Sequence, residues 1–266
     1  MLGSGLTVVE NGQGPAVILV HGALGDYRQW LSISERLEPQ YRVLAVSRRY
    51  HWPNPSPSPD ALYSYESHRD DLLELLRSFA DPVHLVGHSY GAGVALLAAL
   101  GEPARVRSLT LIEPAIASVV SAAAPGFEPE VVSRAAMVAA VQAFVRARQD
   151  ERGAEALFDW LQGGEAGFKK LPEPVKEGLL ANAATVGPTF SSPAPHVTCD
   201  QLRSLGVPTL VANGALTRVW YRLVGEAIGD CTAGAQVAEI PGGRHMVIVE
   251  NPAATAALLL SFLLRY

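Results

Sequence analysis

Ser89 lies in a local pattern that is typical of the nucleophile in acyl-transfer enzymes. It occupies the centre of a Gly-His-Ser-Tyr-Gly sequence over residues 87–91, which fits the pattern G-x-S-x-G. The apolar residues 83–86 precede this sequence as a candidate buried strand, and the small apolar residues 91–100 follow it as a candidate helix. We therefore predict a tight turn that lifts the Ser89 hydroxyl above a sheet, with glycines on either side because a Cβ would collide there. The alternative is a serine that serves only the turn.

A serine hydroxyl needs a base within hydrogen-bonding distance, and the position of His245 in the sequence suits that task. This histidine follows Gly242, Gly243 and Arg244, just after the last predicted strand at residues 236–240. A loop at that point presents its side chains at the carboxyl edge of a parallel sheet, where Ser89 is also expected. We therefore predict that His245 is the base.

Five other histidines are expected to serve other purposes. His68, His84 and His88 fall at the start of a helix, inside a strand and beside the nucleophile, and we interpret all three as structural. His51 and His196 fall in loops, where either could contact a substrate. A solvent-exposed loop histidine is the interpretation that we favour for both.

The sequence also indicates two donors that could stabilise the oxyanion formed by attack at a carbonyl. Gly22 comes directly after the first buried strand, where backbone N–H groups can turn toward the same edge of the sheet as Ser89. The candidates are the backbone amides of Ala23, in that turn, and of Tyr90, which follows the nucleophile.

Strands and helices alternate along most of the chain, as in an α/β fold with a parallel sheet. We predict strands over residues 16–20, 42–46, 83–86, 107–112, 208–212 and 236–240, and helices over residues 30–37, 66–79, 91–100, 131–149, 155–161 and 253–264.

The alternation stops between about residues 115 and 205, where alanine-rich helical stretches take over. We therefore expect a mostly parallel, twisted sheet flanked by helices, built from residues 1–114 and 206–266. Residues 115–205 are expected to form a helical cap inserted into this core.

His21-Gly22, the motif around Ser89 and Gly243-Arg244-His245 together resemble the α/β-hydrolase superfamily over nearly the whole chain. The resemblance implies the α/β-hydrolase fold of a serine hydrolase with a helical cap. It also implies that nucleophile, acid and histidine follow one another in that order. It does not choose among the many substrates of the superfamily.

Thr217 departs from the pattern of that superfamily. Members usually carry an aspartate about three residues after the glycine that ends the penultimate strand, and Thr217 stands there in this chain. Threonine cannot stabilise an imidazolium as a carboxylate does. Glu113 is the substitute that we favour, because it ends the strand after the nucleophile helix, and branches similar to haloalkane dehalogenases use a glutamate at this point. A turn carboxylate is the alternative for Glu113, and Glu239 and Asp230 are weaker candidates for the acid.

Composition and charge exclude several classes of partner. The chain is 48% hydrophobic and 18% charged with a net charge of −5 and no dense basic run, so nucleic acid is not expected. No apolar run reaches the roughly 18 residues of a membrane span, and residues 1–11 lack the features of a signal peptide. We therefore expect a cytoplasmic protein in which Cys199 and Cys231 are reduced thiols rather than a disulfide.

These patterns predict hydrolysis of a carboxylic ester or lactone through an acyl-enzyme intermediate, without a metal or organic cofactor. Ser89 is expected to attack, His245 to transfer the proton, Glu113 to orient His245, and Ala23 and Tyr90 to stabilise the oxyanion. The apolar content of the cap favours a small-molecule substrate with an apolar acyl or alcohol group. Two alternatives stay open: a cofactor-free lyase or C–C hydrolase with the same residues, and a ligand receptor that has lost turnover.

Overall fold

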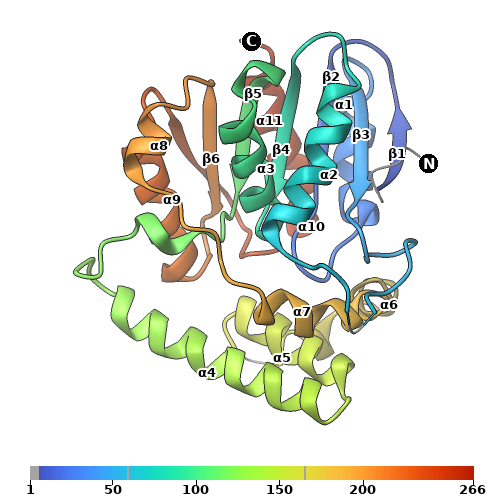
Figure 1. The fold of residues 1–266 in the computed structure, drawn as a ribbon, viewed down its shortest axis with the longest axis vertical. Coiled ribbons are helices and arrows are strands. Elements are labelled where there is room, and N and C mark those ends of the chain that lie inside the picture. Colours follow the sequence, from blue (N-terminus) through green and yellow to red (C-terminus); the bar gives the residue numbers. More distant parts are fainter. Residues whose placement is uncertain (1–5, 59, 165) are drawn as a thin grey trace.

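A seven-stranded sheet runs through the centre of the protein, with strand order β1-β3-β2-β4-β5-β6-β7 (Figure 1). The computed structural model describes residues 6–58, 60–164 and 166–266, so residues 1–5, 59 and 165 of the predicted core and cap lie outside it. β1 pairs antiparallel with β3, and the remaining pairs are parallel. The strands are β1 (Thr7–Asn11), β2 (Ala16–Val20), β3 (Arg42–Ser47), β4 (Val83–His88), β5 (Val106–Ile112), β6 (Thr209–Gly214) and β7 (Gln236–Ile240).

Helices cover both faces of the sheet, which explains why strand β2 is apolar along its whole length. Along β2, Ile18 and Val20 belong to one buried cluster, whereas Val17 and Leu19 belong to the other. The first cluster includes side chains of α2 (Tyr65–Arg77), α3 (Tyr90–Gly101) and α9 (Val219–Cys231). The second includes side chains of α1 (Leu31–Leu37), α10 (Val247–Glu250) and α11 (Pro252–Leu263).

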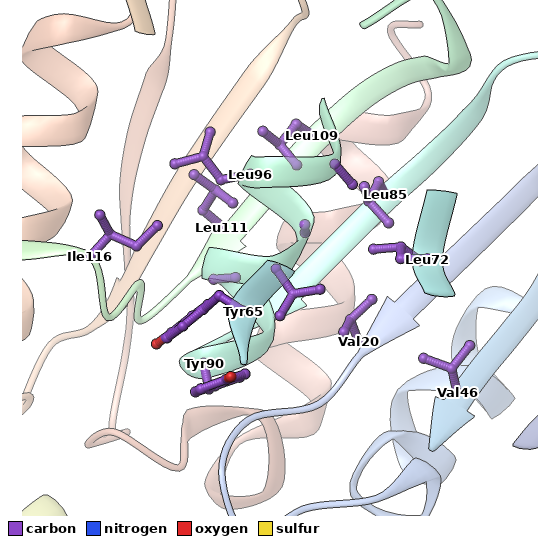
Figure 2. Close-up of a cluster of buried hydrophobic side chains, with 14 of the residues drawn as sticks. Val20, Val46, Tyr65, Leu72, Leu85, Tyr90, Leu96, Leu109, Leu111 and Ile116 are labelled. Carbon is purple, nitrogen blue, oxygen red and sulfur yellow. The ribbon is translucent and has the colours of Figure 1, made fainter. Parts of the chain in front are cut away.

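The first cluster reaches from the middle of the sheet to the start of α3 (Figure 2). Leu85 and Leu109 of the strands contribute to it near Leu96 of α3. At the beginning of α3 the ring of Tyr90 stacks on the ring of Tyr65, with centroids 3.8 Å apart. This apolar packing fixes the start of the helix that follows Ser89.

Between β5 and β6 the chain forms a helical segment. It contains α4 (Phe127–Arg146), α5 (Asp150–Leu161), α6 (Glu173–Leu180), α7 (Val186–Ser191) and α8 (Cys199–Arg203). Helices α4 to α7 gather beyond one end of the sheet, at the bottom of Figure 1. Side chains of this segment meet Ser89 across a cavity, so they lie over the carboxyl edge of the sheet.

Every strand and helix predicted from the sequence forms, although several begin or end a few residues from the predicted limits. The edge strand β1 and helices α6 to α10 are not among the predicted elements. Among the described residues, no helix combines the length and the apolar character needed to cross a membrane.

The prediction of two reduced thiols is wrong, because Cys199 and Cys231 form a disulfide. Cys199 is the first residue of α8 and Cys231 the last residue of α9. These ends lie together in space, with the two Cα atoms 4.9 Å apart, although the cysteines are 32 positions apart in the sequence. The packing of α8 on α9 creates this proximity, and cysteine spacing alone does not reveal it.

Candidate active site

Ser89 sits on a strained turn between β4 and α3. Its backbone has φ 54° and ψ −117°, a conformation that residues with a side chain rarely adopt. A Cβ on Gly87 would collide with the carbonyl of Gly91, and one on Gly91 would collide with the carbonyls at the end of β2. The Ser89 N–H donates to the carbonyl of Ile112 on β5 over 2.9 Å, which ties the turn to the neighbouring strand.

The structure brings Ser89, His245 and Glu113 into one hydrogen-bonded series. Nε2 of His245 lies 2.9 Å from Oγ of Ser89, and Nδ1 lies 3.1 Å from Oε2 of Glu113. All three residues are buried, with 6% of Ser89, 1% of His245 and none of Glu113 exposed. Because a carboxylate accepts, Nδ1 carries the proton, and Nε2 is left to accept from the serine hydroxyl.

Glu113 directly follows β5 with a positive φ of 51°, and its N–H donates to the carbonyl of Ala212 over 2.8 Å. Oε1 accepts a hydrogen bond from the backbone N–H of Gly214 and Oε2 accepts one from the hydroxyl of Thr217, both over 2.6 Å. Burial raises the pKa of Glu113 to about 7, and the hydrogen bonds from Thr217 and Gly214 act in the opposite direction. The threonine at the position of the expected aspartate therefore supports the glutamate that faces His245.

His245 is held from two sides. The ring of Tyr221 packs against its imidazole with centroids 4.0 Å apart, and His88 Nε2 donates to the backbone carbonyl of His245 over 2.8 Å. Burial lowers the pKa of His245 below the ordinary value of histidine, so the imidazole is neutral near pH 7 and can accept a proton. Burial likewise lowers the pKa of His88 to about 3, so this residue acts as a neutral donor.

Ala23 and Tyr90, whose amides were predicted to bind the oxyanion, line the same cavity as Ser89. The orientation of the peptide bond between Gly22 and Ala23 is fixed by hydrogen bonds to its carbonyl oxygen. The Gly22 oxygen accepts from Nη2 of Arg48 over 3.0 Å and from Nδ1 of His21 over 2.8 Å. In a planar trans peptide the C=O and N–H point in opposite directions, so these bonds direct the N–H of Ala23 away from the guanidinium.

Arg48 is a residue to which the sequence analysis gave no role. Only 1% of it is exposed, and its guanidinium lies over the ring of Tyr90, 4.5 Å from the centroid. Nη2 also contacts Nε2 of His51 at 3.2 Å. The prediction of an exposed His51 is therefore wrong: the loop folds back and buries this histidine completely, against Arg48.

Three further histidines lie outside the hydrogen-bonded series. His68 and His84 are buried on α2 and β4, which fits a structural role, and His196 is exposed. Within the described residues, no group of three or more His, Cys, Asp or Glu side chains is arranged to hold a metal ion.

A cavity of about 210 Å³ opens above Ser89 and His245. The helical segment contributes mainly apolar walls, which include Met137, Leu157 and Phe190. One charged side chain from this segment, Arg134 of α4, also lines the cavity, and the sequence analysis did not single it out.

Comparisons with known proteins agree with the fold. The profile of the alpha/beta hydrolase family matches residues 17–258, so the chain belongs to that family and is a hydrolase. It is similar to the 2-(acetamidomethylene)succinate hydrolase of Mesorhizobium japonicum, with 26% identity over 97% of this chain and 91% of that protein.

Two solved structures share the fold. A thermophilic esterase from Thermogutta terrifontis has a TM-score of 0.75 and 24% identity over 98% of this chain and 93% of that one. A hydrolase from Pseudomonas aeruginosa has a TM-score of 0.74 and 26% identity over 97% of this chain and 94% of that one.

Proposed function

We propose that this protein is a serine hydrolase that cleaves a carboxylic ester or lactone through an acyl-enzyme intermediate. The observation that carries the proposal is the buried series from Glu113 through His245 to Ser89, which ends at the cavity. A serine hydroxyl is a weak nucleophile at neutral pH, and this series provides both its base and the group that orients the base.

In the first half of the reaction, Oγ of Ser89 attacks the ester carbonyl while its proton passes to Nε2 of His245. Glu113 keeps the imidazole in the required tautomer and stabilises its positive charge. The N–H groups of Ala23 and Tyr90 stabilise the oxyanion of the tetrahedral intermediate. Collapse of the intermediate breaks the bond to the alcohol, which leaves with the proton from His245.

In the second half, water attacks the acyl group on Ser89, and His245 takes a proton from that water. The acid leaves, and the proton returns to Oγ of Ser89. No further reactant is required. Within this scheme, residues 115–205 act as a cap that shapes the substrate site, and this is supported by the α4, α5 and α7 side chains along the cavity.

The site bears differently on the two alternatives to an ester hydrolase, which are a ligand receptor and a C–C hydrolase. A receptor without turnover has no need of a base and an orienting carboxylate in series with a serine, so the hydrogen bonds favour an enzyme. A C–C hydrolase could use the same three residues. The thermophilic esterase among the similar structures supports ester hydrolysis as the first reaction to test.

Turnover of p-nitrophenyl butyrate by wild type and by Ser89→Ala tests the proposal. The variant removes the attacking oxygen and little volume, so we expect turnover to vanish while the melting temperature stays close to that of wild type. Ser261→Ala, an exposed serine on α11, is the control and should retain full activity. Equal turnover by Ser89→Ala and wild type would contradict the proposal.

A further inference from the structure

Arg134 gives the cavity above Ser89 a positive charge. This arginine lines the cavity. Among the residues that the structure describes, no aspartate or glutamate does so. The two histidines in the lining, His88 and His245, are neutral near pH 7 because burial lowers the pKa of both. The cavity therefore has one cation and no anion along its walls.

The carboxylate closest to Arg134 along its helix is engaged elsewhere. Glu130 lies one turn earlier on α4, at the i, i+4 spacing that commonly forms an ion pair. Its two carboxylate oxygens instead accept from Nε and Nη2 of Arg218, each over 3.1 Å. Arg134 makes no ion pair or side-chain hydrogen bond with another described residue.

The guanidinium of Arg134 is held without being neutralised. It lies over the ring of Trp220, 5.2 Å from the centroid, and Trp220 also lines the cavity. Stacking on an aromatic ring restrains the orientation of a guanidinium and leaves its N–H donors available. A partly buried cation without an anion is costly, and a bound anion would offset that cost.

Two tyrosine hydroxyls add uncharged donors to the same cavity. Tyr65 and Tyr221 both line it, and neither hydroxyl has a hydrogen-bond partner within the described part of the chain. Burial raises the pKa of both tyrosines, and the charge of Arg134 acts in the opposite direction on each. They therefore stay protonated and can donate to a ligand.

We propose that Arg134 binds a carboxylate of the substrate, so that the preferred substrate is an ester or lactone that carries a free carboxylate away from the scissile carbonyl. This inference rests on the proposed function and names its substrate class. A single guanidinium matches a single carboxylate in charge and in bidentate geometry. A phosphate dianion would call for a second cation, and the cavity lining holds one.

Two matched substrate pairs test the proposal. Monoethyl adipate is compared with ethyl hexanoate, which places the carboxylate on the acyl side, and 4-acetoxybenzoate with phenyl acetate, which places it on the alcohol side. We expect the wild type to favour the anionic member of at least one pair. Arg134→Gln should lower kcat/KM for that member by roughly 10- to 100-fold, as expected for loss of a charge-assisted hydrogen bond, and change the neutral member less than about threefold.

Arg146→Gln is the control, because it removes the same charge from an exposed position at the end of α4. It should leave all four rates unchanged. A wild type without preference for either anion, or an Arg134→Gln loss that is equal for charged and neutral substrates, would overturn the assignment. Ester turnover that still depends on Ser89 would in that case leave the proposed function standing.

Binding provides a readout that does not depend on catalysis. Calorimetric titration of Ser89→Ala and of the Ser89→Ala/Arg134→Gln double variant with monoethyl adipate and 4-acetoxybenzoate isolates the contribution of Arg134. Binding of either anion that weakens roughly 10-fold or more in the double variant supports the assignment even if no ester is cleaved. Equal binding by the two variants, or binding of neither anion, would overturn it.

Discussion

The hydroxyl of Thr217 donates to Oε2 of Glu113 over 2.6 Å, and this is the oxygen that contacts Nδ1 of His245 at 3.1 Å. The position that usually carries the acid of the family thus holds a side chain that supports an acid on another strand. Because Thr217 helps to aim Glu113, it becomes a positioning residue of the proposed mechanism. The sequence shows only that Thr217 replaces the usual aspartate, because the contact with Glu113 joins two segments that are distant in the chain.

Thr217→Val should therefore lower kcat/KM on p-nitrophenyl butyrate by about tenfold or more. The substitution keeps the shape of the side chain and removes a hydrogen bond to a charged group, which contributes about 1.5–3 kcal/mol. Thr217→Ser keeps the hydroxyl and should retain most of the activity. Steady-state kinetics on the three proteins checks this expectation, and a Thr217→Val rate equal to that of wild type would exclude a positioning role.

Glu113→Gln should lower kcat by orders of magnitude without unfolding the protein. The amide keeps the size of the side chain but cannot stabilise the imidazolium, and the corresponding change in a serine protease costs roughly 10⁴-fold. Glu239→Gln, an exposed residue on β7, is the matched control and should have no effect. A Glu113→Gln variant with nearly full kcat would reduce Glu113 to a turn carboxylate.

The pH dependence of kcat/KM on a neutral ester reports the protonation of the Glu113–His245 pair. The active form has His245 unprotonated and Glu113 ionised, so activity rises with pH through one apparent step, at roughly 6 to 7, and is lost below it. In Glu113→Gln the residual activity depends on His245 alone, whose pKa burial lowers. We expect the step to move to lower pH in this variant, and an unchanged profile would contradict coupling between the two groups.

Arg48→Met should lower kcat about tenfold with little change in KM. The guanidinium polarises the Gly22–Ala23 peptide through its carbonyl, and a complete oxyanion donor is worth roughly 10²–10³ in kcat. Arg48→Lys keeps the positive charge and should recover part of the loss. Kinetics together with thermal melting separates this role from a structural one, which would lower the melting temperature and leave kcat unchanged.

The sequence could indicate some residues of the proposed site. Their positions follow from local patterns in the chain. Ser89 is set by a strand, a turn and a helix that are contiguous in the chain. Glu113 and His245 each follow a strand of a parallel sheet, and the carboxyl ends of such strands share one edge. The central strands were predictable because a sheet covered by helices on both faces favours mainly apolar runs, as in β2.

The features that the sequence did not reveal depend on how distant segments pack. His51 is buried because its loop folds back onto Arg48, and composition gives no sign of that path. The disulfide between Cys199 and Cys231 depends on the packing of α8 against α9. Arg134 lines the cavity because α4 lies beyond the end of the sheet that carries Ser89, and Glu130 on the same helix pairs with Arg218 instead.

The most direct measurement of the central claim is reaction of the wild-type protein with a fluorophosphonate probe, followed by digestion and mass spectrometry of the labelled peptide. An activated serine attacks such a probe and keeps it, whereas an ordinary surface hydroxyl does not. The account predicts one label per chain, on Ser89, with loss of ester turnover in proportion to labelling. Absence of labelling in folded protein, or a label on a different serine, would contradict the account.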